Sequence, residues 1–271
     1  MPRIAPVTLL AGAVTGALVM RERQSRRAME RLAAATLESL LNAIDANDAE
    51  TGAHVRRVAA YALVLADEAG LDEHSQRIVE RVALFHDIGK IHAALFDIIH
   101  EETRLTAAER RAIATHPARG AAVLAPIAEF YPDLTEGVLA HHERWDGKGY
   151  PDKLRGPRIP LAARIVAIAD TFDVVSHGRR YQRSRSLDHA AEVIARGRGT
   201  QFDPNLVDLF LFPPVFARVR DAGRTLGKPR VLAPPMERRD GSAEPEAPDV
   251  PFRWRTRTGP NVAGAAPSEK R

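Results

Sequence analysis

The chain has 271 residues and ten histidines, and its 39 basic residues exceed its 35 acidic residues for a formal net charge of +4. It contains no cysteine, which excludes disulfides, thiolate zinc sites, iron–sulfur clusters and cysteine nucleophiles. Any metal must therefore be held by histidine, carboxylate or water. The basic excess is spread along the chain without an aromatic-lined basic stripe, which argues against a protein that binds DNA or RNA.

The N-terminal segment contains an uncharged run, Ile4 to Met20, followed by arginines that begin at Arg21. A run of this length is close to the lower limit for a membrane span, and arginines on its C-terminal side favour a cytoplasmic location for the rest. Three interpretations stay open: an anchor in the inner membrane over residues 4–20, a cleaved signal peptide, or a soluble alanine-rich segment. The anchor and its basic flank would end near residue 27.

Apolar residues recur at helical spacing over residues 28–47 and 55–69. In the first of these helices they are Met29, Leu32, Leu37, Leu40, Leu41 and Ile44. Gly70 is a helix-ending residue, and Asp72 is in position to cap a next helix that ends near Phe85.

Three later helix starts are predicted from their capping residues. Thr106 and Glu109 have the spacing of a capping box, Pro160 is typical of a first helical turn, and Ser186 can cap a helix through Ala195. No stretch alternates with the period of a strand. The sequence therefore predicts an all-α helical bundle.

Two segments are predicted to be irregular. The loop from Glu143 to Pro160 is long and rich in glycine and proline, so we expect it to be functional rather than a simple connector. Residues 229–271 are rich in proline, glutamate, arginine, glycine and serine, which predicts disorder. We expect a domain over residues 28–226 and a disordered tail over residues 227–271.

Candidate metal ligands accumulate along the chain. Several lie next to the ends of predicted apolar helices, and Glu50 and His54 are four residues apart on one face of a helix. The full set is Glu50, His54, His86, Asp87, His116, His141, His142 and Asp170. Nitrogen and oxygen ligands in this number suit two or three divalent ions. Two ions about 3.5–4 Å apart can hold a phosphoester and activate water, so the pattern predicts a polynuclear metal phosphohydrolase.

Six segments in chain order resemble the motifs of the HD-GYP family, a branch of the HD phosphohydrolase superfamily. They are ETGAHVRRVAAYA (50–62), ERVALFHDIGKI (80–91), LTAAERRAIATHPARGAAVL (105–124), HHERWDGKGYP (141–151), IPLAARIVAIADTFDVVS (159–176) and QFDP (201–204). HHERWDGKGYP at this distance from HDIGK is the most specific of them.

The resemblance implies an HD-type helical bundle that hydrolyses the bacterial second messenger cyclic di-GMP to pGpG, with GMP as a further product. It implies attack by a hydroxide that bridges the ions of a di- or trinuclear site, with Fe or Mn as the expected metal. The family's ligand positions fall on His54, His86, Asp87, His116, His141, His142 and Asp170. Glu50 occupies the acidic position that marks members able to hold a third ion; the alternative is an ordinary helix-surface carboxylate.

The resemblance also implies roles for other residues. Lys90 and Asp87 are the expected catalytic residues, with Lys90 at the scissile phosphate. The segment Gly149-Tyr150-Pro151 is expected to shape the substrate region and to contact diguanylate cyclase (GGDEF) domains. Arg179 is expected to bind a phosphate of the substrate.

The chain departs from the family after Asp173. In VVSHGRRYQR, Arg180 replaces a proline and Gln182 replaces a basic residue, so Arg183 is expected to supply the lost charge. Two alternative functions stay open. The first is an HD hydrolase that acts on another cyclic dinucleotide or nucleotide, and the second is a non-catalytic signalling or interaction module. A homodimer is a further expectation.

Overall fold

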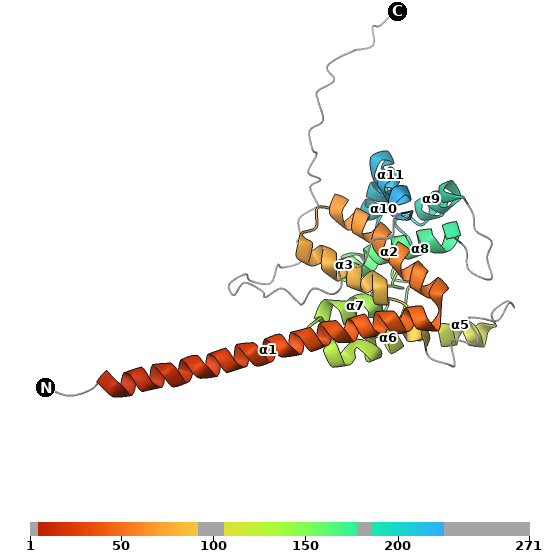
Figure 1. Cartoon of the computed structure of the whole chain (residues 1–271). Helices are drawn as coiled ribbons and strands as arrows, with labels where there is room; N and C mark the ends of the chain where they lie inside the picture. The colour runs from red at the N-terminus through yellow and green to blue at the C-terminus, as the bar shows by residue number, and fades with distance from the viewer. Residues whose placement is uncertain (1–4, 92–105, 178–185, 225–271) are drawn as a thin grey trace, which may run out of the picture. The chain divides into compact units, whose positions relative to one another are not determined.

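A computed structural model of the chain describes residues 5–91, 106–177 and 186–224. The helices in these ranges are α1 (Ala5–Asn47), α2 (Ala49–Glu68), α3 (Glu73–Phe85), α5 (Ala107–Ile113), α6 (His116–Leu124), α7 (Pro132–Ala140), α8 (Leu161–His177), α9 (Leu187–Arg196), α10 (Pro204–Leu211) and α11 (Pro213–Ala222) (Figure 1). Short 3₁₀ helices are η1 (Ile88–Ile91), η2 (Ala125–Ile127) and η3 (Gly156–Arg158). These ranges contain no strand, which confirms the all-α fold.

The chain divides into two units, residues 1–236 and residues 237–271, and every described residue belongs to the first. The predicted disordered tail over residues 229–271 lies outside the described residues.

The predicted helix starts are confirmed by their caps. The Asp72 carboxylate accepts a hydrogen bond from the Ser75 N–H at 2.8 Å. Thr106 and Glu109 form the expected capping box at the start of α5. Ser186 caps α9. These side chains satisfy N–H groups that the first helical turn leaves without a partner.

Helix α1 differs from the sequence-based expectation. Instead of an N-terminal segment followed by a separate helix over 28–47, one helix runs from Ala5 to Asn47. Leu37 and Ile44 on its C-terminal half are buried, whereas Met29 and Leu32 are 49% and 60% exposed because they lie on another face. Within the described part of the chain, no helix is both long and apolar enough to cross a membrane.

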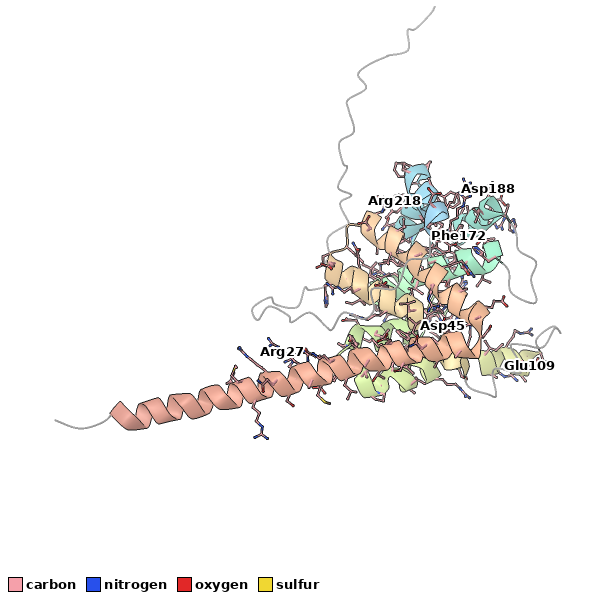
Figure 2. The ribbon with its side chains drawn as sticks, in the orientation of Figure 1. Arg27, Asp45, Glu109, Phe172, Asp188 and Arg218 are labelled. Atoms are coloured by element: carbon pink, nitrogen blue, oxygen red, sulfur yellow. The ribbon has the colours of Figure 1, made fainter. Side chains whose placement is uncertain are left out.

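The junction of α1 and α2 is held by a bidentate ion pair between Asp45 and Arg56. Gly52 lies against the Asp45 carboxylate, where a Cβ would collide with Oδ1. Figure 2 shows Asp45 near the end of α1, where the chain turns into α2. The pair therefore fixes the end of α1 against the first two turns of α2, the part of that helix that carries His54.

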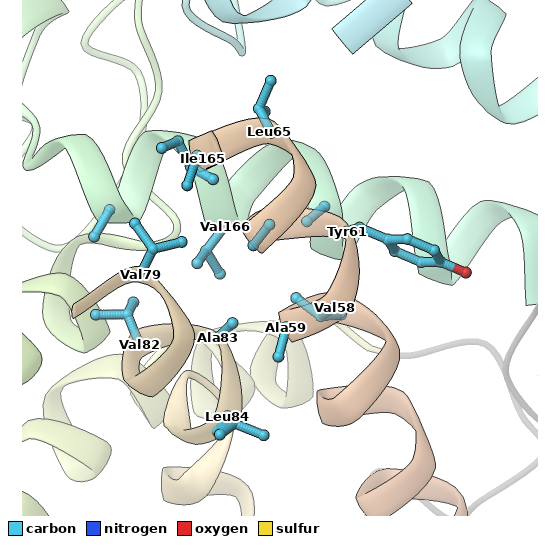
Figure 3. Packing of buried hydrophobic residues seen from close by; sticks show 14 of the residues in the cluster. Val58, Ala59, Tyr61, Leu65, Val79, Val82, Ala83, Leu84, Ile165 and Val166 are labelled. Atoms are coloured by element: carbon cyan, nitrogen blue, oxygen red, sulfur yellow. The ribbon is translucent and has the colours of Figure 1, made fainter. Parts of the chain in front are cut away.

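The core lies between α2, α3 and α8, and Figure 3 shows apolar side chains of all three helices in one cluster. Val58 and Leu65 on α2, Val82 on α3, and Ile165 and Val166 on α8 are fully buried. Each such side chain contributes about 1.5–3 kcal/mol when it leaves water. This packing gives the three helices a defined relative position.

Helices α10 and α11 pack against the C-terminal parts of α2 and α8. The Phe172 ring of α8 lies 5.2 Å from the rings of Tyr61 and Phe210, measured between centroids. Arg218 of α11, which Figure 2 labels, forms ion pairs with Asp67 at 2.8 Å and with Glu68 at the end of α2. The helices after α8 therefore extend the same core.

One local prediction needs correction. The sequence places His116 at the end of a helix, but α5 ends at Ile113 and His116 is the first residue of α6. Asp170, which ends the apolar run ARIVAIAD, lies inside α8, because the helix continues to His177. Pro160 lies directly ahead of α8, as expected, and its carbonyl accepts from Arg164 N–H at 3.1 Å.

Candidate metal centre

The structure brings most of the predicted ligands together in two groups of three. Within each group, one ligand atom from each residue lies within 4.8 Å of the others. The groups are His54, His86 and Asp170, and His116, His141 and His142. They come from α2, α3 and α8 in the first case and from α6 and the end of α7 in the second.

Asp87 lies between the two groups. Its Oδ2 is 3.5 Å from His86 Nε2 and 3.9 Å from His54 Nε2, and its Oδ1 is 3.3 Å from His116 Nε2. A carboxylate with one oxygen toward each group is in the position of a ligand that bridges two cations. Of the eight residues for which the sequence predicts metal ligation, all except Glu50 are thus gathered at one place.

Close backbone packing puts Asp87 there. Gly89 follows it in η1, and a Cβ on Gly89 would lie 2.6 Å from the backbone N of Gly120 in α6. Only glycine allows this approach without a shift of the backbone. The glycine of HDIGK therefore brings the Asp87 segment against the helix that begins with His116.

Helix ends orient the imidazole rings. His86 and His141 follow the last residues of α3 and α7, where the final carbonyl groups have no partner within the helix. Their Nδ1 atoms lie 2.7 Å from Ala83 O and 2.6 Å from Val138 O. His116 Nδ1 likewise lies 2.7 Å from Ile113 O, near the end of α5.

These contacts set the tautomers. A carbonyl oxygen can only accept, so in the neutral rings Nδ1 carries the proton and Nε2 carries a lone pair. The Nε2 atoms of His116 and His141 nevertheless lie 3.1 Å apart. Two lone pairs at this distance repel each other unless a cation lies between them. The Nε2 atom of His86 is also buried, and it has no hydrogen-bond partner among the described residues. The donor set therefore fits divalent metal ions.

Electrostatics favour the ligand forms of several residues. Burial lowers the pKa of His141 well below its ordinary value, and neighbouring imidazoles lower it further. Burial and His116 lower the pKa of His142 to about 3. Burial opposes ionisation of Asp170, but the neighbouring imidazoles of His54 and His86 hold its pKa well below the usual range. Neutral imidazoles and an ionised carboxylate can bind a cation without first losing a proton.

His86 behaves differently. Burial lowers its pKa, but the negative charges of Asp87 and Asp170 outweigh burial and raise it. The carboxylates thus attract a positive charge to this position, which either a proton or a metal ion can supply.

Lys90 lies next to the Asp87 carboxylate. Its Nζ is 2.7 Å from Asp87 Oδ2, and its side chain is mostly buried. The lysine follows Asp87 by three residues in the tight turn of η1, which keeps a positive charge at the edge of the metal centre.

The glycine- and proline-rich loop contributes one aromatic ring to the site. The ring of Tyr150 stacks on that of His142, with 5.0 Å between centroids and 24° between planes. Gly149 packs against the backbone of Glu143, where a Cβ would lie 2.5 Å from Cα. Pro151 is exposed. Among these three predicted substrate contacts, only Tyr150 contacts a candidate ligand through its side chain.

Other predicted site residues do not join the groups. Glu50 is exposed in the first turn of α2, on the same helix as His54, and belongs to neither group of three. Arg179 and Arg183 lie outside the described residues.

Three supporting residues were not predicted from the sequence. Asp173 accepts a hydrogen bond from His54 Nδ1 at 2.7 Å and a bidentate pair from Arg57. The Glu143 carboxylate is buried and accepts from the Asp152 N–H of the loop at 2.7 Å. Arg57 and Asp173 each follow a predicted ligand by three residues, so helical spacing was the available signal.

Comparisons with known proteins agree with this geometry. A family profile described as HD domain matches residues 38–206. The chain is 38% identical over 177 residues to the cyclic di-GMP phosphodiesterase response regulator RpfG of Xanthomonas campestris pv. campestris. The chain belongs to the HD-GYP branch of the HD domain family.

Other relatives of this HD-GYP chain differ in their named substrates. It is 37% identical over 174 residues to 3'3'-cGAMP-specific phosphodiesterase 2 of Vibrio cholerae, and 35% identical over 204 residues to a cyclic di-GMP phosphodiesterase of the same organism. These three alignments cover 64–68% of this chain but only 33–47% of the relatives. The HD-GYP chain thus spans a third to a half of their length.

Solved structures support the fold. The crystal structure of the cyclic GMP-AMP-specific phosphodiesterase V-cGAP3 of Vibrio cholerae matches the HD-GYP chain with a TM-score of 0.52 at 20% identity. That match covers 74% of this chain and 55% of the other. A second match, to the HDG"Y"P protein Bd1817 of Bdellovibrio bacteriovorus, has a TM-score of 0.51 at 15% identity.

Proposed function

We propose that this chain hydrolyses cyclic di-GMP to pGpG in a reaction that depends on divalent metal ions. The observation that carries the proposal is the position of Asp87 between two groups of three ligands, all with nitrogen or oxygen donors. Relatives that are named cyclic di-GMP phosphodiesterases support the choice of substrate.

Divalent ions, when bound there, would lower the pKa of a water molecule and neutralise charge on the phosphoryl oxygens. Hydrolysis forms a bond from the water oxygen to phosphorus and breaks the bond to the ribose 3′ oxygen, which takes up a proton. Fe and Mn are the proposed metals, since imidazole and carboxylate ligands suit both. Hydrolysis of the second phosphodiester bond would yield GMP.

The residues of the chain have distinct proposed roles. Asp87 and the six residues of the two groups hold the ions. Lys90, close to Asp87, places a positive charge where negative charge develops on the phosphate. Tyr150 closes one side of the site by its stack on His142. Arg179 and Arg183 are proposed to bind phosphate groups of the substrate, and Glu50 to support a third ion.

A second substrate is favoured by a specific observation. Relatives at 34–37% identity are named 3'3'-cGAMP-specific phosphodiesterases. The assay must therefore include both cyclic dinucleotides.

Further proposals concern the organisation of the chain. We retain the domain bounds of 28–226 with a tail over 227–271, a contact of the Gly149–Pro151 segment with diguanylate cyclase domains, and a homodimer.

The test uses the full chain, loaded anaerobically with Mn²⁺ or Fe²⁺ and supplied with cyclic di-GMP or 3'3'-cGAMP. Products are resolved by chromatography and mass spectrometry. We expect pGpG from cyclic di-GMP, lost in a His86→Ala/Asp87→Ala variant and retained in His189→Ala, a histidine on α9 outside the two ligand groups.

Each result has a defined meaning. Turnover of 3'3'-cGAMP alone would replace the proposed substrate. Bound metal without turnover of either would favour another nucleotide, and a protein with neither metal nor turnover would favour the interaction module. Metal content measured by mass spectrometry is expected to fall from three ions to two in Glu50→Gln; an unchanged content would make Glu50 a surface carboxylate.

A further inference from the structure

Asp173 is a buried carboxylate with several hydrogen-bond donors around it, and the proposed reaction does not use it directly. It lies on α8, one turn after Asp170, and is 1% exposed. Its Oδ2 accepts from His54 Nδ1 at 2.7 Å, and its two oxygens accept from Arg57 Nε and Nη2 at 2.7 and 2.8 Å. His177 Nδ1 approaches Oδ1 at 3.1 Å from the exposed side.

The position of His54 explains why such a partner is needed. His86, His116 and His141 use carbonyl groups that helix ends leave free, whereas His54 lies inside α2. Carbonyl groups inside a helix already accept from N–H groups four residues later. No such helix-end carbonyl is therefore available to fix the His54 ring, and a side chain has to supply the acceptor.

The charge state of Asp173 suits this role. The Arg57 guanidinium, which always carries a positive charge, donates to both of its oxygens, and a carboxylate in such a bidentate pair is ionised. An ionised carboxylate only accepts hydrogen bonds. The Nδ1 atom of His54 must then carry the proton, and a neutral ring presents the Nε2 lone pair to the site. That atom lies 3.3 Å from Asp170 Oδ1 and 3.9 Å from Asp87 Oδ2.

We propose that Asp173, held by Arg57, is a positioning residue that fixes His54 in the tautomer and orientation needed for metal binding. The inference deepens the proposed function and rests on it only in that the two ligand groups bind divalent metal. Partners of this kind, behind a ligating histidine, typically change metal affinity by about 10–100-fold.

The decisive variant is Asp173→Asn in the full chain. Its amide oxygen can still accept from Arg57, but its NH₂ group would face His54 Nδ1 and force the ring proton onto Nε2. Shape and volume are nearly unchanged, so a loss of metal affinity would report the tautomer. Asp203→Asn is the matched control, because Asp203 is also buried and paired with an arginine, Arg164, at 2.8 Å.

The readouts need no turnover. Mn²⁺ affinity is measured by calorimetry, and the His54 tautomer in the metal-free protein is read from long-range ¹H–¹⁵N NMR spectra. We expect Asp173→Asn to bind Mn²⁺ about 10–100-fold more weakly and to move the His54 proton from Nδ1 to Nε2. Asp203→Asn should retain both wild-type properties.

Two results would overturn the proposal: wild-type Mn²⁺ affinity in a folded Asp173→Asn variant, or a wild-type spectrum with the His54 proton on Nε2. The second result is measured on the wild type, so the proposal can still be overturned if Asp173→Asn does not fold. Absence of cyclic dinucleotide hydrolysis by the wild type would overturn the proposed function without changing either readout.

Discussion

At the scale of single residues, the site depends on which atoms of Asp87 and the histidines face inward. Asp87 directs one oxygen toward each ligand group, and three histidines use carbonyl groups near helix ends to fix their outer nitrogen. The inner nitrogens are therefore available as ligands.

Lys90 provides a prediction at this scale. Lys90→Ala removes the charge 2.7 Å from Asp87 Oδ2, and loss of one electrostatic group of this kind costs about 10²–10³ in kcat. We expect that loss for cyclic di-GMP hydrolysis, measured by steady-state kinetics, with metal content unchanged. Lys148→Ala, at an exposed lysine of the loop, is the control. A kcat within threefold of the wild type would remove Lys90 from the catalytic residues.

At the scale of elements, the loop from Glu143 to Pro160 shows how backbone packing places a side chain. Gly149 lies against the backbone of Glu143, and the buried Glu143 carboxylate accepts from the Asp152 N–H. The loop is thus anchored on both sides of Tyr150, whose ring reaches His142. Gly149 was predicted to shape the substrate region, and the geometry gives it a packing role through the loop.

Gly149→Ala tests this anchoring. The added methyl group would overlap the backbone of residues 143 and 144, so the loop must shift, at a cost of about 1–3 kcal/mol. We expect lower stability in urea unfolding and at least a tenfold loss in kcat/KM as Tyr150 moves. Unchanged stability together with unchanged kcat/KM would show that the loop accommodates the methyl group.

The cap of α3 gives a prediction with a defined pH dependence. Replacement of Asp72 by alanine removes the acceptor of the Ser75 N–H and should destabilise the protein by about 1 kcal/mol at pH 7. That bond lowers the pKa of Asp72. A lowered folded-state pKa stabilises the protein above the unfolded-state value of about 3.9, and this contribution is lost as the pH falls through the folded-state pKa.

Urea unfolding of the wild type and Asp72→Ala at pH 7 and near pH 3.5 measures the effect. The difference between the two proteins should shrink at the lower pH. Asp72→Asn, which keeps an acceptor oxygen, is expected to remain close to the wild type at pH 7. A difference that grows on acidification would contradict the assigned charge state of the cap.

At the scale of the whole molecule, the metal centre connects segments that are far apart in the sequence. Its candidate ligands come from α2, the end of α3, the start of α6, the end of α7 and the middle of α8. Metal binding should therefore oppose unfolding of the whole domain rather than of one helix.

Thermal unfolding of the full chain tests this connection. Mn²⁺ at about 100 times its Kd should stabilise the folded protein by about 2.7 kcal/mol, which raises the Tm by roughly 5–10 °C. EDTA should reverse the shift, and the His86→Ala/Asp87→Ala variant should show none. An equal shift in this variant would place the stabilising metal elsewhere on the chain.

The sequence alone determined the helical class and the caps, and it predicted the candidate ligands. Helical periodicity, Asp72, Thr106 and Ser186 act within a few residues, so local physics decides them. The seven ligand positions followed from residue types and the family motifs. Local patterns did not show that α1 is continuous or that Met29 and Leu32 face away from the core.

Tertiary structure decided which atoms meet. His116 begins α6 and Asp170 lies inside α8. The packing of α2, α3 and α8, together with the close contact of η1 with α6 at Gly89, brings these helices to one site. Contacts such as Asp173 with His54 join residues 119 positions apart. No local pattern encodes such a contact, because burial and ring orientation depend on all the helices at once.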